Sequence, residues 1–451
     1  MPWRRLLLAA ILACVLLSAA CSRKTEKFPP LQGEITELAG EFLSLLRAGD
    51  YTEAVTYFDA TMKKELPAGK LQEAWEAVQH QAGPYRQEVA QRTEELGRYR
   101  VVIITARFAL AQLDIRLTFN SDNRIAGLYF LPAENPVTAE YQPPSYGLPA
   151  KYSEQDVTVG KGEWALPGTL TVPDGEGPFP AVILVHGSGP QDRDETIGPN
   201  KPFKDLALGL ANRGIAVLRY DKRTKVHGAK IASLSAFTVR EESIEDALAA
   251  FSLLQAESKI RDDKIFLLGH SLGGTLAPRI GAENNNLAGL IILAGAVRPL
   301  EELILEQSRY LAEADGTVNE AEAAQLELLE QSIKHIRDPK LAPDTPPAQL
   351  LNIPASYWLD LRGYNPAATA MNLQLPLLIL QGERDYQVTM EDFALWQEYL
   401  AGSGNVTFKS YAGLNHLFQA GEGNSLPAEY EEAKNIDAAV IHDIADWIRA
   451  H

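Results

Sequence analysis

The chain has 451 residues, of which 46% are hydrophobic and 22% charged, a composition typical of a folded protein with two or three domains. Its 59 acidic residues outnumber its 42 lysines and arginines, so the formal net charge is −17. This charge argues against a nucleic-acid partner, because a phosphate backbone is bound by clustered lysines and arginines.

The N-terminus has the parts of a secretory signal peptide, which is predicted to span residues 1–20. Two arginines precede an apolar run at 6–17 that is short for a membrane span, and small residues follow at 18–20. The stretch Leu17-Ser18-Ala19-Ala20-Cys21 resembles a bacterial lipobox, although Ser18 stands where that motif prefers leucine. The resemblance implies a lipid on Cys21, export across the bacterial inner membrane and anchoring to the cell envelope. A plain secretory signal, which gives a soluble periplasmic or extracellular protein, is the alternative.

A polar tether at 21–30 precedes a first domain, predicted at 31–139. Apolar residues recur at helical spacing from Ile35 to Leu46, and two more helices are predicted at 51–58 and 69–81. Alternating patterns predict strands at 99–108, 111–120 and 124–131, with a hairpin turn at 121–123. Helices followed by an antiparallel sheet indicate a small α+β domain.

This first domain resembles the DUF3887 domain that precedes many secreted bacterial hydrolases. The resemblance is carried by Glu41-Phe42-Leu43 and Gly49-Asp50-Tyr51, and it implies a cone-like fold akin to NTF2. The domain contains no catalytic set, metal-ligand cluster or phosphate loop. A Pro-rich segment at 140–150 follows and is predicted to be a linker.

From Lys151 to His451 the pattern changes to apolar strands separated by amphipathic helices, which predicts a mostly parallel sheet covered on both faces. A hairpin is expected at 155–160 and 168–172. Strands are predicted at 181–186, 215–220, 265–269, 287–294, 376–381 and 406–411, and helices at 201–213, 239–255 and 428–449. Between 297 and 372 the alternation stops, and helices at 300–315 and 318–336 predict a helical cap.

The segment Gly269-His270-Ser271-Leu272-Gly273 follows one of these apolar runs and begins a helix-compatible one. A serine there sits on a sharp strand-to-helix turn, and the flanking glycines relieve the crowding. The helix N-terminus behind it favours developing negative charge. Ser271 is therefore predicted to be a nucleophile, and the N–H of Leu272 is predicted to be one oxyanion donor.

A serine hydroxyl needs a base, and the base needs an acid that fixes its tautomer. Glu383 and Asp385 both follow the run at 376–381, where the acid is expected. His416 follows the last strand in a turn-like segment and is predicted to be the base.

The ordered set of loop, nucleophile, acid and base resembles the α/β-hydrolase superfamily, most closely secreted bacterial carboxylesterases and the nearby prolyl-oligopeptidase-like and dienelactone-hydrolase-like branches. The resemblance favours Asp385 over Glu383, because Gly382, Asp385 and Val388 match a strand-Gly-x-x-Asp-x-x-Val form. It also assigns the second oxyanion donor to the N–H of Ser188 in an H-G-x motif, with Gly187 as the alternative.

Other residues near these motifs are open to two interpretations. His186 and His270 are interpreted as structural. The run 191–194 either lines the pocket or braces the loop, and Tyr357-Trp358 either packs in the core or lines the entrance.

The predicted function is hydrolysis of a small carboxylic ester through an acyl-enzyme. No Rossmann, P-loop or zinc pattern is present in the sequence, so neither a cofactor nor a metal is predicted. An aminopeptidase or acyl-peptide hydrolase with the same triad is the first alternative. An inactive, lipid-anchored binding protein is the second.

Overall fold

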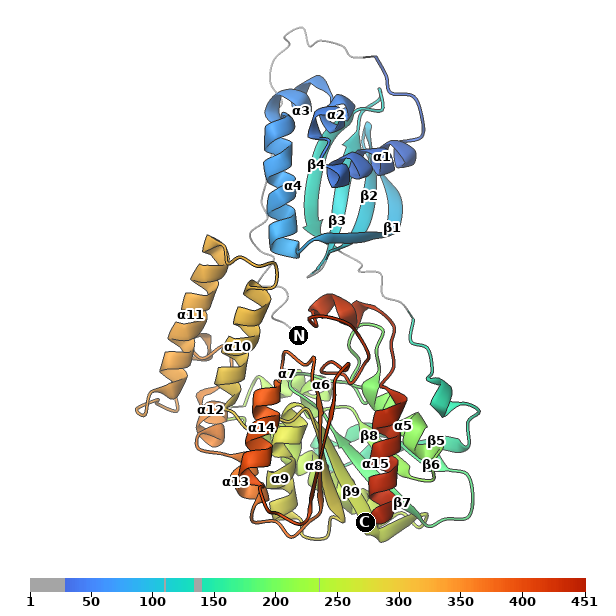
Figure 1. The fold of residues 1–451 in the computed structure, drawn as a ribbon, viewed down its shortest axis with the longest axis vertical. Coiled ribbons are helices and arrows are strands. Elements are labelled where there is room, and N and C mark those ends of the chain that lie inside the picture. Colours follow the sequence, from blue (N-terminus) through green and yellow to red (C-terminus); the bar gives the residue numbers. More distant parts are fainter. Residues whose placement is uncertain (1–28, 109–110, 134–139, 235) are drawn as a thin grey trace. The chain divides into compact units, whose positions relative to one another are not determined.

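The computed structural model describes residues 29–451 except 109–110, 134–139 and 235. The predicted signal peptide and Cys21 therefore lie outside the described residues. The chain divides into two compact units, the first made of residues up to 138 with 426–429 and the second of 139–425 with 430–451. Each is described by itself (Figure 1).

The first unit packs four helices against a four-stranded antiparallel sheet with the order β1-β2-β3-β4. Its helices are α1 (Ile35–Ala48), α2 (Tyr51–Ala54), α3 (Ala60–Glu65) and α4 (Ala68–Ala82), and its strands are β1 (Tyr85–Leu96), β2 (Tyr99–Phe108), β3 (Gln112–Phe119) and β4 (Ile125–Pro132). Phe42, Trp75 and Phe108 belong to the shared core. The predicted α+β class is confirmed, but α3 and β1 were missed. β1 is an edge strand, and its residues are mostly exposed on both faces, so its sequence is polar and shows no apolar alternation.

The second unit is built on an eight-stranded sheet with the order β12-β11-β10-β9-β7-β8-β6-β5. The six strands β7 to β12 are parallel to one another, whereas β6 pairs antiparallel with both β8 and β5. The strands are β5 (Tyr152–Val159), β6 (Leu166–Pro173), β7 (Phe179–Val185), β8 (Ala216–Tyr220), β9 (Ile260–His270), β10 (Gly289–Leu293), β11 (Leu377–Gly382) and β12 (Val406–Tyr411). The predicted α/β fold is confirmed.

Each face of this sheet has its own apolar core, because successive strand residues point to opposite sides. In β7, Ile183 contributes to one core and Leu184 to the other. The first core is covered by α8 (Glu245–Gln255), α9 (Leu272–Glu283) and α14 (Met390–Tyr399), and the second by α5 (Pro202–Ala211) and α15 (Ala438–Ala450). The sheet is thus the middle layer of three (Figure 1), and its buried strands explain the unbroken apolar runs in the sequence.

The last helix begins at Ala438, not near residue 428 as predicted. Asp437 caps it by accepting the N–H of Ala439. The preceding residues Asn435 and Ile436 donate to the carboxylate of Asp205, and this pairing holds them outside the helix.

The predicted linker packs on the second unit. The Tyr141 hydroxyl donates to Asp205 Oδ1 at 2.8 Å, and the Tyr146 hydroxyl donates to the Ile436 carbonyl at 2.9 Å.

The helices between β10 and β11 agree with the predicted cap. They are α10 (Leu300–Ala312), α11 (Glu320–Arg337), α12 (Ala355–Leu361) and α13 (Pro366–Ala370). α10 and α11 lie side by side, whereas the short α12 and α13 were not predicted. Tyr357 and Trp358 in α12 are buried, so the packing interpretation is confirmed for this pair.

Candidate active site

Ser271 occupies a strained turn between β9 and α9. Its φ of 54° and ψ of −119° lie in a region that non-glycine residues rarely adopt. A Cβ at Gly269 would collide with the carbonyl oxygen of Gly273, and a Cβ at Gly273 would collide with that of Val185. The turn therefore requires glycine on both sides of the serine, and this requirement is why the motif could be recognised from the sequence.

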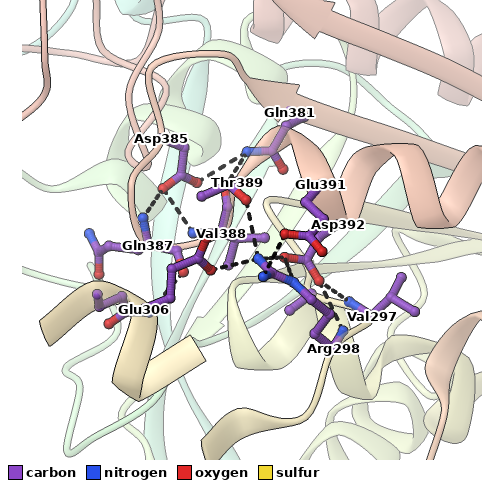
Figure 2. A network of polar contacts seen from close by, with 12 residues as sticks. Val297, Arg298, Glu306, Gln381, Asp385, Gln387, Val388, Thr389, Glu391 and Asp392 are labelled. Atoms are coloured by element: carbon purple, nitrogen blue, oxygen red, sulfur yellow. Dashed lines mark hydrogen bonds and ion pairs between the residues drawn. The ribbon is translucent and has the colours of Figure 1, made fainter. Parts of the chain in front are cut away.

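Asp385 and His416 form a buried pair on the loops that follow β11 and β12. His416 Nδ1 lies 2.6 Å from Asp385 Oδ2. The other carboxylate oxygen accepts the N–H groups of Gln387 and Val388 at 2.7 and 3.1 Å, and Gln381 donates to Oδ2 at 3.2 Å (Figure 2). Donors thus hold the carboxylate in one orientation toward the imidazole. Glu383 is exposed and accepts instead from the Ser410 hydroxyl at 2.7 Å.

His270 joins the serine turn to the loop of His416. Its Nε2 lies 2.9 Å from the backbone oxygen of His416, and the two imidazole centroids are 4.7 Å apart. Within the described ranges, no hydrogen bond joins the Ser271 hydroxyl to His416. Catalytic hydrogen bonds are often long without substrate and shorten when it binds. The contacts of His270 with His416 nevertheless place the predicted base close to Ser271, the predicted nucleophile.

Two backbone N–H groups beside Ser271 have no acceptor among the described residues. Leu272 is the first residue of α9, where N–H groups lack an intrahelical partner, and Ser188 lies in the exposed part of the loop after β7. The N–H of Gly187, in contrast, donates to Glu195 Oε1 at 2.7 Å. A Cβ at Gly187 would stand 3.1 Å from the Ser271 Cβ, so this loop lies directly against the serine.

Glu195 and His270 form a second buried pair that no sequence motif indicated. Glu195 Oε2 lies 2.9 Å from His270 Nδ1, and both side chains are almost completely buried. Burial alone would raise the pKa of Glu195, but His270 lowers it below its usual value. Burial would lower the pKa of His270, but Glu195 raises it above its usual value. The two groups thus stabilise each other's charged form behind Ser271.

The loop after β7 is braced by its own polar residues. His186 Nε2 lies 3.0 Å from the Asp192 backbone oxygen, and burial lowers the pKa of this imidazole to about 4. Arg193 donates to Asp221, and Asp194 pairs with Arg219 and Lys201. The bracing interpretation of 191–194 therefore fits the structure better than pocket lining, and the structural interpretation of His186 and His270 holds.

Arg298 ties the start of the cap to the loop that carries Asp385 (Figure 2). Its guanidinium donates to Asp392 Oδ2 at 2.7 Å, to Glu306 at 2.7 Å and to the Thr389 hydroxyl at 3.1 Å. Burial would lower the pKa of Arg298, but the carboxylates raise it. The Asp385 loop is thereby fixed from the cap side, through contacts that no local sequence motif indicated.

Neither a membrane-spanning helix nor a group of three potential metal ligands is found among the residues that the structure describes.

A mostly parallel sheet with a serine at a strand-to-helix turn, followed in chain order by an acid and a histidine on later loops, defines an α/β-hydrolase. A family profile described as serine aminopeptidase, S33 matches residues 178–422, and one of the DUF3887 family, of unknown function, matches 39–128. The chain is 37% identical over 416 residues to Esterase EstD of Thermotoga maritima, which covers 92% of this chain and 96% of that protein. The chain belongs to the S33 serine aminopeptidase family of hydrolases, with an N-terminal DUF3887 domain, and it is an enzyme of the carboxylesterase type.

Solved structures that resemble the chain include Est1E of Butyrivibrio proteoclasticus, at 17% identity and a TM-score of 0.43, covering 66% of this chain and 99% of that one. An esterase of Pyrobaculum calidifontis is similar at 16% identity and a TM-score of 0.43, covering 68% of this chain and 87% of that one. A puromycin hydrolase is similar at 16% identity and a TM-score of 0.43, over 82% of this chain and 48% of that one.

Proposed function

We propose that the protein hydrolyses carboxylic esters of small molecules through an acyl-enzyme formed on Ser271. The observation that carries this proposal is the buried Asp385–His416 pair, 2.6 Å apart, whose imidazole packs against the residue next to Ser271. The name of the relative, an esterase, supports an ester substrate.

The proposed reaction assigns each step to a group of this chain. Ser271 Oγ attacks the ester carbonyl carbon while His416 Nε2 takes the hydroxyl proton. Asp385 holds Nδ1–H and stabilises the imidazolium, and the N–H groups of Leu272 and Ser188 stabilise the oxyanion. His416 then gives the proton to the leaving alcohol. Water attacks the acyl-enzyme with the same base, which releases the acid and restores Ser271.

Labelling with a fluorophosphonate probe and turnover of a p-nitrophenyl ester test this mechanism. Ser271→Ala is expected to abolish labelling and to lower turnover on the order of a millionfold, with the circular dichroism spectrum unchanged. Retention of more than about a tenth of the wild-type turnover would contradict the role of Ser271. A wild-type protein that neither labels nor turns over would instead favour the inactive binding protein.

The second candidate function is hydrolysis of peptides from an amino end, because the matching family is described as a serine aminopeptidase. Such an enzyme needs an anionic group for the substrate ammonium, and the buried carboxylate of Glu195, on the loop beside Ser271, is already engaged by Gly187 and His270. The ester substrate is therefore favoured. A panel of p-nitrophenyl esters against aminoacyl anilides decides between the two, since a higher kcat/KM for the anilides would reverse the order.

We also propose that the protein is exported and anchored by a lipid on Cys21. The support is the sequence at 1–21 alone, and stable anchoring needs more than one acyl chain. Metabolic labelling with a palmitate analogue should mark the wild-type protein and fail for Cys21→Ser. An unlabelled wild type that is nonetheless exported would favour the plain secretory signal.

A further inference from the structure

Lys222 is a buried lysine that contacts the loop beside Ser271. Its side chain is 2% exposed, and its Nζ donates to Glu242 Oε1 at 2.6 Å and to the backbone oxygen of Gly187 at 2.7 Å. The other oxygen of Glu242 accepts the Tyr357 hydroxyl of α12 at 2.7 Å. Removing a lysine from water is costly, and its ammonium carries three N–H donors, of which Glu242 and the Gly187 carbonyl each take one.

The contact with Gly187 matters because the carbonyl of Gly187 and the N–H of Ser188 belong to one peptide unit. Among the described residues the cis peptide bonds precede Pro149 and Pro178, so this unit is trans. In a planar trans peptide the carbonyl and the N–H point in opposite directions. A fixed direction for the Gly187 oxygen therefore fixes the direction of the Ser188 N–H. A cation on the oxygen also polarises the amide, which strengthens its N–H as a donor.

The loop is held from both sides of Gly187. Glu195 accepts the N–H of Gly187 at 2.7 Å, and Lys222 donates to its oxygen at the same distance. An anion on one side and a cation on the other therefore orient two successive peptide units. The unpartnered N–H of Ser188 is the group that these contacts leave available.

We propose that Lys222 is a positioning residue of the oxyanion hole, which orients and polarises the Gly187–Ser188 peptide. The inference rests on the proposed serine-esterase mechanism and deepens it. Glu242 fixes the Lys222 ammonium, and Tyr357 fixes Glu242. The cap helix α12 therefore reaches the oxyanion loop through a continuous chain of hydrogen bonds.

The test uses the full chain with the pair replaced as a unit, Lys222→Met with Glu242→Gln, so that no buried charge loses its partner. Loss of an oxyanion donor costs about 10²–10³ in kcat, and a donor that is present but not oriented should cost roughly 10–100-fold. KM for p-nitrophenyl acetate should stay near the wild-type value. Affinity for a trifluoromethyl ketone, whose adduct carries an oxyanion, should fall by the same factor as kcat/KM.

The matched control is the neighbouring buried pair, replaced as Arg223→Met with Asp246→Asn. Its side chains are 7% and 6% exposed, with an N–O distance of 2.5 Å, and their hydrogen bonds do not reach the oxyanion loop. This control should keep wild-type kcat and ketone affinity. Equal losses in both double variants would overturn the inference, because they would reflect the loss of any buried pair.

Tyr357→Phe decides the question if the Lys222 double variant does not fold. Loss of the hydroxyl should lower kcat about threefold, as expected for one modest hydrogen bond, with KM unchanged. If the wild type labels on Ser271 and a folded variant of either kind keeps wild-type kcat and ketone affinity, the role of Lys222 is overturned and the proposed function stands. A wild type that does not label overturns the proposed function, and the inference falls with it.

Discussion

Replacement of Glu195 by alanine should destabilise the second unit by about 3–5 kcal/mol, the usual cost of breaking a buried charge pair from one side. The variant leaves the N–H of Gly187 without its acceptor and leaves the His270 imidazolium without its anion, since Glu195 lies 2.7 and 2.9 Å from these groups. Glu195→Gln should cost about 1 kcal/mol, because the amide oxygen still accepts from Gly187 and a neutral His270 can accept from the amide N–H.

The pH dependence of this difference follows from the two pKa shifts. The contribution of His270, whose pKa is raised, is complete below its unfolded value of about 6.5 and is lost as the pH rises through its folded pKa. The contribution of Glu195, whose pKa is lowered, is present above about 4.5 and is lost as the pH falls through its folded pKa. The stability difference between wild type and Glu195→Gln should therefore be largest between about pH 4.5 and 6.5.

Urea unfolding followed by circular dichroism measures these free energies. Glu398→Ala on the exposed face of α14 is the control and should stay within about 0.5 kcal/mol of the wild type. The reasoning would be refuted if Glu195→Ala lost less than about 1 kcal/mol, or if the alanine and glutamine variants lost the same amount.

Three further predictions concern the acid, a buried carboxyl and the division of the chain. Asp385→Asn should lower kcat roughly ten-thousandfold, whereas Glu383→Gln should leave kcat near the wild-type value. The reverse ranking in steady-state kinetics would identify Glu383 as the acid. Burial raises the pKa of Asp205 to about 7, although hydrogen bonds from Ile436, Tyr141 and Asn435 oppose this shift. Between about pH 4 and 7 the folded state therefore holds a proton that the unfolded state has lost, so the free energy of unfolding should fall as the pH rises. Asp205→Asn should remove this slope in urea titrations. A chain that begins at Glu140, and so keeps the contacts of Tyr141 and Tyr146 with the second unit, should keep its turnover per folded molecule on a small ester. A folded but inactive product would show that the first unit helps to build the site.

The sequence predicts best what depends on neighbouring residues. The buried strand β7 is recognisable because both of its faces enter a core, so its apolar run is unbroken. The turn at Ser271 is recognisable because its glycines lie within two residues of the serine. Chain order then selects His416, and the structure pairs it with Asp385 at 2.6 Å.

The sequence fails where distant residues make the choice. Nothing next to Lys222 indicates that its ammonium reaches a carbonyl 35 positions earlier. The start of α15 depends on Asp205, which holds Asn435 and Ile436 outside the helix from about 230 positions away. Most residues of the strand β1 are exposed on both faces, so its polar sequence shows no apolar alternation and indicates no strand.

The hydrogen bond from His270 to the backbone of His416 spans 146 positions of the chain, and it has a consequence for the order of synthesis. The ribosome delivers the serine turn well before β12 and the loop that follows it. Until then, a growing chain has the proposed nucleophile but neither the proposed base nor the contact that holds that base in place. Such long-range closure is slow compared with local folding, so hydrolytic activity should appear abruptly, only after nearly the whole chain has been made.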